Sequence, residues 1–214
     1  MWSISKTLIE ENFLKQMSFE VVSKFEKLIA EFFGAPYAVA TDSCTHAIEL
    51  SLRYLNITSR VAIPTRTYIS LPFILQKLNI NWDWKNERWE NFYRIDGTNI
   101  YDAAVLWKRG SYIKDTFMCI SFQFQKHLSI GRGGMILTDS KDAYETLMKM
   151  SYDGRIRDIP WREQNISSYG FHYYMPPESA HIGIEKFEKV VNKEPKIWTF
   201  DDYPNLRKMN VFSS

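Results

Sequence analysis

The stretch YAVATDSCTHAIELSL, residues 37–52, decides the fold class. Tyr37 to Thr41 form an apolar run of strand length, and Thr41-Asp42-Ser43 supplies side chains that cap helices. Apolar residues then recur at helical spacing as far as Tyr54. The stretch therefore predicts a strand, a tight turn and a helix.

The same unit recurs along the chain. Arg60 to Ile63 have the length and composition of a strand, Pro64 opens a turn, and residues 67–78 have the spacing of a helix. The other predicted strands are residues 79–83, 99–102, 117–122 and 135–138, and the other predicted helices lie within residues 5–33, 141–150 and 177–191. Residues 84–94 show no periodicity that assigns them. Strands that alternate with helices predict an α/β fold with a mostly parallel sheet sandwiched between helices.

The composition narrows the functional classes. With 214 residues and 45% hydrophobic side chains, the chain can bury a sizeable core, which excludes a disordered or fibrous protein. Its 27 basic residues against 25 acidic ones leave a formal charge of +2, so nothing favours a nucleic acid or a membrane surface as a partner. The two cysteines, Cys44 and Cys119, fit a reducing cytoplasm. No stretch predicts a signal peptide or a membrane span.

Three positions directly after predicted strands carry groups that could do chemistry, because ligands bind beyond the carboxyl ends of the strands in such sheets. Asp42-Ser43-Cys44-Thr45 opens a helix and offers amides and hydroxyls to a phosphate, although an ordinary N-cap is the simpler explanation of these residues alone. Asp102 is either a catalytic carboxylate or a helix cap. Lys126 is either a nucleophile or a solvated surface lysine.

Together these residues form a pattern that is more specific than its parts. PTRTYIS (64–70), DAAVL (102–106) and SFQFQKHLSIGRGGMILT (121–138) follow the helix start in this order. The pattern resembles the DegT-like (DegT/StrS) sugar aminotransferases, which are pyridoxal-phosphate enzymes of the aspartate aminotransferase fold. The resemblance extends through SSYGFHYYMPPESAHIGIEKFEKV (167–190), and SF-x-x-x-K with a following GG is its most specific motif.

The resemblance implies catalytic roles for two matched residues. Lys126 would form the Schiff base with the cofactor aldehyde and later move the proton. Asp102 would pair with the pyridine nitrogen and keep it protonated. Tyr68 would stack on the face of the cofactor ring.

The resemblance also implies how the phosphate of the cofactor, pyridoxal 5′-phosphate, is bound. The backbone amides of Cys44 and Thr45, with the hydroxyls of Thr45 and Ser121, would hold it at the helix start. His172 stands where the family has an amide side chain that reaches across a dimer to the partner's cofactor phosphate. His172 either takes over that contact or only packs among its aromatic neighbours.

Several residues depart from the family pattern. Cys44 replaces the glycine that usually precedes the phosphate-binding threonine, Asp42 lies close by, and Val105 replaces a polar residue. Glycine permits backbone angles that cysteine tolerates poorly, and an acid weakens phosphate binding unless it points away. Both changes therefore predict a cost in cofactor binding. The chain between Asp83 and Asp102 is also much shorter than the family pattern.

The resemblance implies one large domain followed by a tail. Residues 1–192 would form the cofactor-binding large domain of the type I pyridoxal-phosphate-dependent transferase fold. Residues 193–214 would cross the surface or the partner subunit, and the family's small C-terminal domain would be absent, which makes the chain a shortened form.

The implied function is a cytoplasmic, homodimeric, pyridoxal-phosphate-dependent aminotransferase. It would transfer an amino group from an amino acid, with glutamate as the expected donor, to a nucleotide-linked keto-sugar. Two alternatives remain open. One is a degenerate scaffold that binds the cofactor with little transaminase activity. The other is a nucleotide-binding or other α/β protein without pyridoxal phosphate, which is disfavoured because Gly131 to Gly134 lack the spacing of known nucleotide-binding loops.

Overall fold

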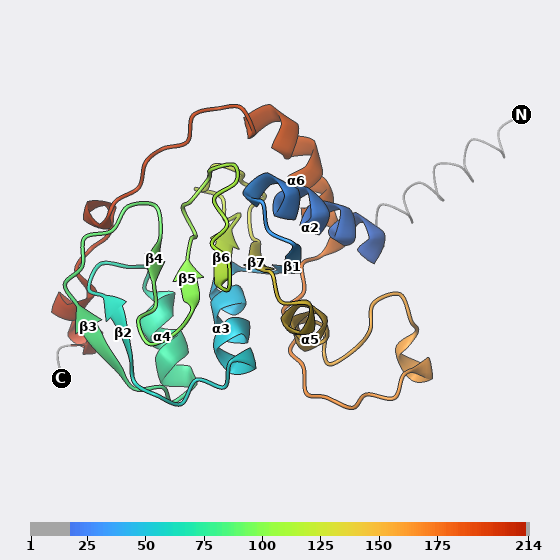
Figure 1. The fold of residues 1–214 in the computed structure, drawn as a ribbon, viewed down its shortest axis with the longest axis horizontal. Coiled ribbons are helices and arrows are strands. Elements are labelled where there is room, and N and C mark those ends of the chain that lie inside the picture. The colour runs from blue at the N-terminus through green and yellow to red at the C-terminus, as the bar shows by residue number, and fades with distance from the viewer. Residues whose placement is uncertain (1–17, 213–214) are drawn as a thin grey trace, which may run out of the picture.

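The computed structural model describes residues 18–212, which form a layered α/β structure (Figure 1). Its helices are α2 (Phe19–Phe33), α3 (Cys44–Tyr54), α4 (Ser70–Lys77), α5 (Lys141–Ser151) and α6 (Pro177–Val190). Its strands are β1 (Tyr37–Thr41), β2 (Val61–Pro64), β3 (Trp82–Lys85), β4 (Tyr93–Arg94), β5 (Ile100–Asp102), β6 (Phe117–Ser121) and β7 (Gly134–Thr138). The part of the predicted first helix before residue 18 lies outside the described residues. None of the helices within residues 18–212 has the length and apolar content needed to cross a bilayer.

The α/β class is confirmed, but the sheet is mixed and not mostly parallel. The main sheet has the order β1-β7-β6-β5-β4, and β2 and β3 form a separate parallel pair. Among neighbouring strands of the main sheet in residues 18–212, only β5 and β6 run parallel. The reason lies in the connections: the loops from β6 to β7 and from β4 to β5 turn the chain back, so these neighbours run antiparallel.

The strands that precede the candidate chemical groups nevertheless point the same way. Because β7 is antiparallel to both β1 and β6, these two strands share a direction, and β5 is parallel to β6. The carboxyl ends of β1, β5 and β6 therefore meet at one edge of the sheet. That edge is where an open α/β sheet binds its ligands.

Both faces of the central strands are buried, which explains their continuous apolar sequences. On β6, Met118 and Ile120 join the core beneath α2 and α6, whereas Phe117 and Cys119 face α3 and α5 on the opposite side. Figure 1 shows α2 and α6 together on one side of the sheet and α3 and α5 on the other. The helices and the central strands were predicted to within a few residues at their ends.

A buried ion pair ties α2 to the loop that follows α5. The guanidinium of Arg157 donates to both carboxylate oxygens of Glu26, at 2.9 and 3.0 Å, and both side chains are almost fully buried, with 5% and 4% exposure. Glu26 also accepts the backbone N–H of Ala40 in β1 at 2.7 Å. The pair thus joins three segments that are far apart in sequence.

The C-terminal segment crosses the surface of its own chain, one of the two predicted courses. The Phe200 amide donates to the Trp89 carbonyl at 3.1 Å, and the Leu206 amide donates to the Thr65 carbonyl at 2.8 Å. The guanidinium of Arg66 donates to the Tyr203 carbonyl at 2.7 Å. Figure 1 shows this segment running back beside β2 and β3. The tail is therefore placed beside the residues that sequence periodicity left unassigned.

Candidate functional site

A cavity of about 330 Å³ opens at the sheet edge where β1, β5 and β6 end. Six of the seven residues predicted from the sequence line it: Cys44, Thr45, Tyr68, Asp102, Ser121 and Lys126. They come from α3, the turn before α4, the ends of β5 and β6, and the loop after β6. The fold therefore brings together groups that are spread over much of the sequence.

The start of α3 forms one end of the cavity. Ser43 caps the helix by accepting the His46 amide at 3.2 Å, which leaves the N–H groups of Cys44 and Thr45 at the helix start. Cys44 is the first residue of α3 and has no positive φ, so the predicted need for glycine does not arise there. The glycine requirement falls on Gly134 instead, where an added Cβ would lie 2.3 Å from the Cys44 nitrogen. The start of α3 and the start of β7 thus contact each other through backbone atoms, with no side chain between them.

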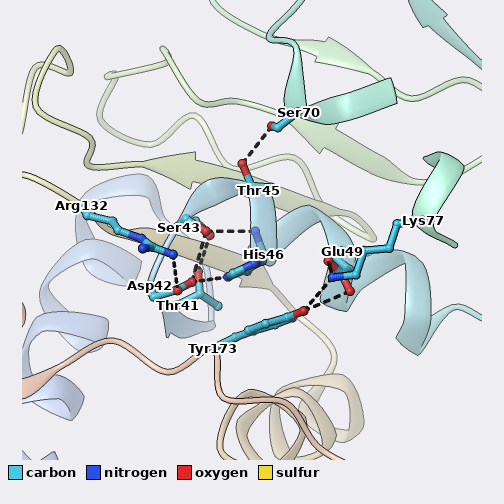
Figure 2. Close-up of polar contacts among 10 residues, drawn as sticks. All are labelled: Thr41, Asp42, Ser43, Thr45, His46, Glu49, Ser70, Lys77, Arg132 and Tyr173. Atoms are coloured by element: carbon cyan, nitrogen blue, oxygen red, sulfur yellow. Dashed lines mark hydrogen bonds and ion pairs between the residues drawn. The ribbon is translucent and has the colours of Figure 1, made fainter. Parts of the chain in front are cut away.

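The Asp42 carboxylate contacts a guanidinium and an imidazole ring, as Figure 2 shows. Arg132 donates to its Oδ2 at 2.7 Å, and His46 Nδ1 lies 2.5 Å from its Oδ1. Arg132, rather than Asp42, borders the cavity. The predicted repulsion between Asp42 and a phosphate is therefore offset by a guanidinium at the cavity rim.

A second polar cluster in Figure 2 fixes α3 to its neighbours. The His46 ring stacks on Tyr173 with centroids 3.6 Å apart, and the Tyr173 hydroxyl donates to Glu49 at 3.3 Å. Burial alone would raise the pKa of Glu49, but hydrogen bonds from Lys77 (3.0 Å) and Arg53 (2.8 Å) outweigh it and lower the pKa. The carboxylate therefore stays ionised inside the protein. This cluster joins α3 to α4 and to the segment before α6, and so fixes the position of the helix start.

Lys126 lies in the loop after β6 and extends its amine into the cavity region. Its Nζ is 5.5 Å from the centre of the Trp198 ring. Burial lowers the pKa of Lys126, while the nearby Asp102 and Cys44 act in the opposite direction. A lowered pKa leaves a larger fraction of the amine unprotonated, which is what a nucleophilic lysine requires.

Asp102 ends β5 with both carboxylate oxygens engaged. Oδ2 accepts the hydroxyl of Tyr93 at 2.5 Å, and Oδ1 accepts the backbone N–H of Ala104 at 3.0 Å. Burial raises the pKa of Asp102, and these hydrogen bonds together with the charge of Lys126 oppose that rise. The cavity thus places a buried carboxylate in the field of a buried amine.

Two groups of lining residues were not predicted from the sequence. Trp89, Asn91 and Tyr93 come from the unassigned segment, and Trp198, Asp202 and Tyr203 come from the tail. The density of Trp and Tyr in these segments is the one signal that could have indicated a ring-lined surface.

His172 does not line the cavity within residues 18–212. Its Nδ1 lies 2.9 Å from Asp153 Oδ2, its side chain is largely exposed, and its ring meets Tyr174 edge to face. A contact with the phosphate of a partner subunit therefore stays a prediction.

Known proteins match most of the chain. The model of the DegT/DnrJ/EryC1/StrS aminotransferase family matches residues 6–80 and 108–196. An uncharacterized protein of Methanocaldococcus jannaschii is 24% identical, over 78% of this chain and 56% of the relative. The family match leaves residues 81–107 unaligned, and this gap includes Trp89, Tyr93 and Asp102.

Solved structures share the fold at low identity. AtS13 from Actinomadura melliaura superimposes with a TM-score of 0.73 and 20% identity over 85% of this chain and 64% of its own. The sugar aminotransferase CalS13 from Micromonospora echinospora gives 0.65 and 12%, over 79% and 60%. NtdA from Bacillus subtilis, solved with the cofactor PMP bound, gives 0.65 and 17%, over 80% and 48%. The chain thus spans 48% to 64% of the length of these structures.

Proposed function

The chain belongs to the DegT/DnrJ/EryC1/StrS aminotransferase family, and on that premise we propose that it is a pyridoxal-phosphate-dependent aminotransferase. Its proposed amino donor is an amino acid, with glutamate as the first choice, and its proposed acceptor is a nucleotide-linked keto-sugar. The observation that carries this proposal is the convergence of Lys126, Asp102 and the start of α3 on one cavity. The two cysteines are free thiols, which agrees with a cytoplasmic location.

The residues around the cavity fit pyridoxal 5′-phosphate. The start of α3 offers N–H groups and the hydroxyl of Thr45 to the phosphate, and Gly134 keeps that end free of a side chain. Ser121 adds a hydroxyl at the end of β6. Asp102 is a buried carboxylate suited to a protonated ring nitrogen, and Lys126 is an amine suited to the aldehyde. The donor set therefore matches the phosphate, the ring nitrogen and the aldehyde of the cofactor.

The chain's own residues would then divide the work of amino transfer. Lys126 would bond to the cofactor aldehyde and, once released as a free amine, would move the substrate proton. Asp102 would keep a proton on the ring nitrogen. When bound, pyridoxal phosphate acts as an electron sink for the carbanion at the substrate's α-carbon. Trp89, Trp198 and Tyr203 would exclude water from the reacting groups.

Absorption spectroscopy tests the proposed function directly. Adding pyridoxal phosphate to the cofactor-free protein is expected to produce a visible band, because Lys126 bonds to the aldehyde. Adding L-glutamate is then expected to remove the band and to form 2-oxoglutarate. A band that persists with every amino acid offered would favour the catalytically degenerate scaffold. If the protein does not bind pyridoxal phosphate at all, the proposal is wrong.

We also propose a homodimer in which His172 approaches the partner's cofactor phosphate. The loop between α5 and α6 extends from the body of the chain and exposes Trp161 (68%) and Tyr169 (96%), which a second copy would cover (Figure 1).

His172→Ala is expected to weaken cofactor affinity about tenfold, because a charge-assisted hydrogen bond is lost, while sedimentation equilibrium still gives a dimer. Unchanged affinity would leave His172 as a packing residue. A cofactor-loaded wild-type monomer at micromolar concentration would contradict the dimer.

A further inference from the structure

We propose that Tyr93 is a positioning residue for Asp102, and that a hydrogen-bonded chain from Thr67 through Tyr93 presents the Asp102 carboxylate to the cavity. The cofactor-facing part of this role rests on the proposed function. Tyr93 and Asp102 themselves both lie in residues 81–107, which the family match leaves unaligned.

The register of two short strands places Tyr93 against Asp102. In the antiparallel pair of β4 and β5, Tyr93 is directly opposite Asp102. Residues opposite each other in an antiparallel pair point to the same face, so both side chains lie on one side of the sheet. The hydroxyl of Tyr93 reaches Oδ2 of Asp102 at 2.5 Å. A slip of one residue would turn Tyr93 to the other face and break this contact.

The hydrogen bonds in the chain have a fixed direction. Burial, followed by the charge of Asp102, raises the pKa of Tyr93 well above its ordinary value, so the phenol stays protonated. A phenol has one proton, and Tyr93 donates it to Oδ2 of Asp102. Tyr93 must then accept its second hydrogen bond from the hydroxyl of Thr67, which is also buried. Asp102 is therefore the acceptor at the end of a directed chain.

Aromatic neighbours hold Tyr93 in place. The ring of Trp89 packs against it with centroids 5.1 Å apart, and the ring of Tyr203 packs against Trp89 with centroids 5.3 Å apart. The indole N–H of Trp89 donates to the Arg66 carbonyl at 2.8 Å. The tail thus supports Tyr93 through Trp89, and the hydroxyl has little freedom to leave Asp102.

The hydrogen bond from Tyr93 acts on the charge of Asp102. Burial favours the neutral carboxyl, whereas Tyr93, the Ala104 amide and Lys126 favour the carboxylate. The remaining titratable groups whose charge couples to Asp102 are Cys44, Cys119 and Tyr203. A carboxylate that stays ionised and cannot rotate is what a protonated ring nitrogen needs as a partner.

The test compares Tyr93→Phe with Tyr112→Phe in the full chain. Tyr112 is a matched control, because its hydroxyl donates to the Thr116 carbonyl at 3.0 Å away from the cavity. In the cofactor-free protein, carbon-13 carboxyl NMR measures the pKa of Asp102, with the signal assigned through Asp102→Asn. We expect the Asp102 pKa to rise in Tyr93→Phe and to stay unchanged in Tyr112→Phe.

Titration with pyridoxal phosphate provides the second measurement. A protonated Asp102 cannot hold a protonated ring nitrogen. As the pH is lowered, the affinity for pyridoxal phosphate should therefore begin to fall at a higher pH in Tyr93→Phe than in the wild type. Between the two transitions we expect the variant to bind the cofactor more weakly than the wild type, by tenfold for each unit by which the Asp102 pKa has risen. A merely structural role for Tyr93 would weaken binding equally at all pH values.

The outcomes separate this inference from the proposed function. An unchanged Asp102 pKa in Tyr93→Phe would overturn the inference, whereas binding of pyridoxal phosphate by the wild type would still support the function. A raised pKa in a protein whose wild type does not bind the cofactor would overturn the function and the cofactor-facing role of Tyr93. If Tyr93→Phe does not fold, Thr67→Val takes its place as the test. A raised Asp102 pKa in Thr67→Val would support the hydrogen-bonded chain from Thr67 through Tyr93, and an unchanged pKa would overturn the inference.

Discussion

Sodium borohydride is expected to fix pyridoxal phosphate permanently on Lys126 of the wild-type protein and to leave Lys126→Ala unlabelled. The reduction captures the covalent bond between the Lys126 amine and the cofactor aldehyde, and peptide mass spectrometry locates it. Burial favours this reaction because it lowers the pKa of Lys126. We expect amino transfer from glutamate to fall about 10²- to 10⁴-fold in Lys126→Ala, the usual contribution of a positioned proton-transfer group.

Lys196 offers a matched control for this experiment. Its Nζ lies 3.8 Å from the centre of the same Trp198 ring that Lys126 approaches, but its side chain is 55% exposed. Lys196→Ala should therefore keep the label on Lys126. Labelling that moves to Lys196 or spreads over many lysines would show surface modification and would remove Lys126 from the role of nucleophile.

The regular elements were predictable because their signals are local. The continuous apolar run of β6 is explained by burial on both faces. The capping residues directly before α3 indicate where that helix begins. Asp102, Ser121 and Lys126 could be selected because they follow strands, and strand ends collect at one edge. Local signals thus identified the half of the cavity that the sheet builds.

The other half of the cavity depends on non-local pairing. Tyr93 joins the site only because β4 pairs with β5 in one register, and no periodicity in residues 84–94 indicates a strand of two residues. Trp198 joins because its backbone exchanges hydrogen bonds with Asn91, at 2.7 and 2.9 Å. Such contacts form between segments without a regular pattern, so the sequence does not indicate their partners.

The prediction of a mostly parallel sheet was wrong at β7 for a related reason. Gly131, Gly133 and Gly134 indicate a loop, but a loop alone does not say whether the chain crosses over or turns back. The structure turns back, and Gly134 then pairs with Ser121. The candidate site still lies where a parallel sheet would place it, because β1 and β6 run in the same direction although the sheet is mixed.

The buried pair of Glu26 and Arg157 carries the largest stability effect that we expect. Glu26→Ala would leave the Arg157 guanidinium charged, buried and unpaired, and its Nε already has no hydrogen-bond partner among residues 18–212. Breaking such a pair costs about 3 to 5 kcal/mol of unfolding free energy. Urea denaturation at neutral pH measures the loss. As a control, Glu145→Ala removes an exposed partner of Lys141 and should cost at most about 1 kcal/mol.

A double variant separates the charge from the packing. Glu26→Leu with Arg157→Met removes both charges and keeps apolar volume, so it should be more stable than Glu26→Ala alone. The Ala40 amide would still lose its acceptor, which Glu26 provides at 2.7 Å, so we expect about 1 to 3 kcal/mol of the loss to persist. If Glu26→Ala and the double variant are equally unstable, the loss comes from the amide and the cavity rather than from the unpaired guanidinium. If Glu26→Ala costs no more than Glu145→Ala, the ion pair does not hold α2 to the loop after α5.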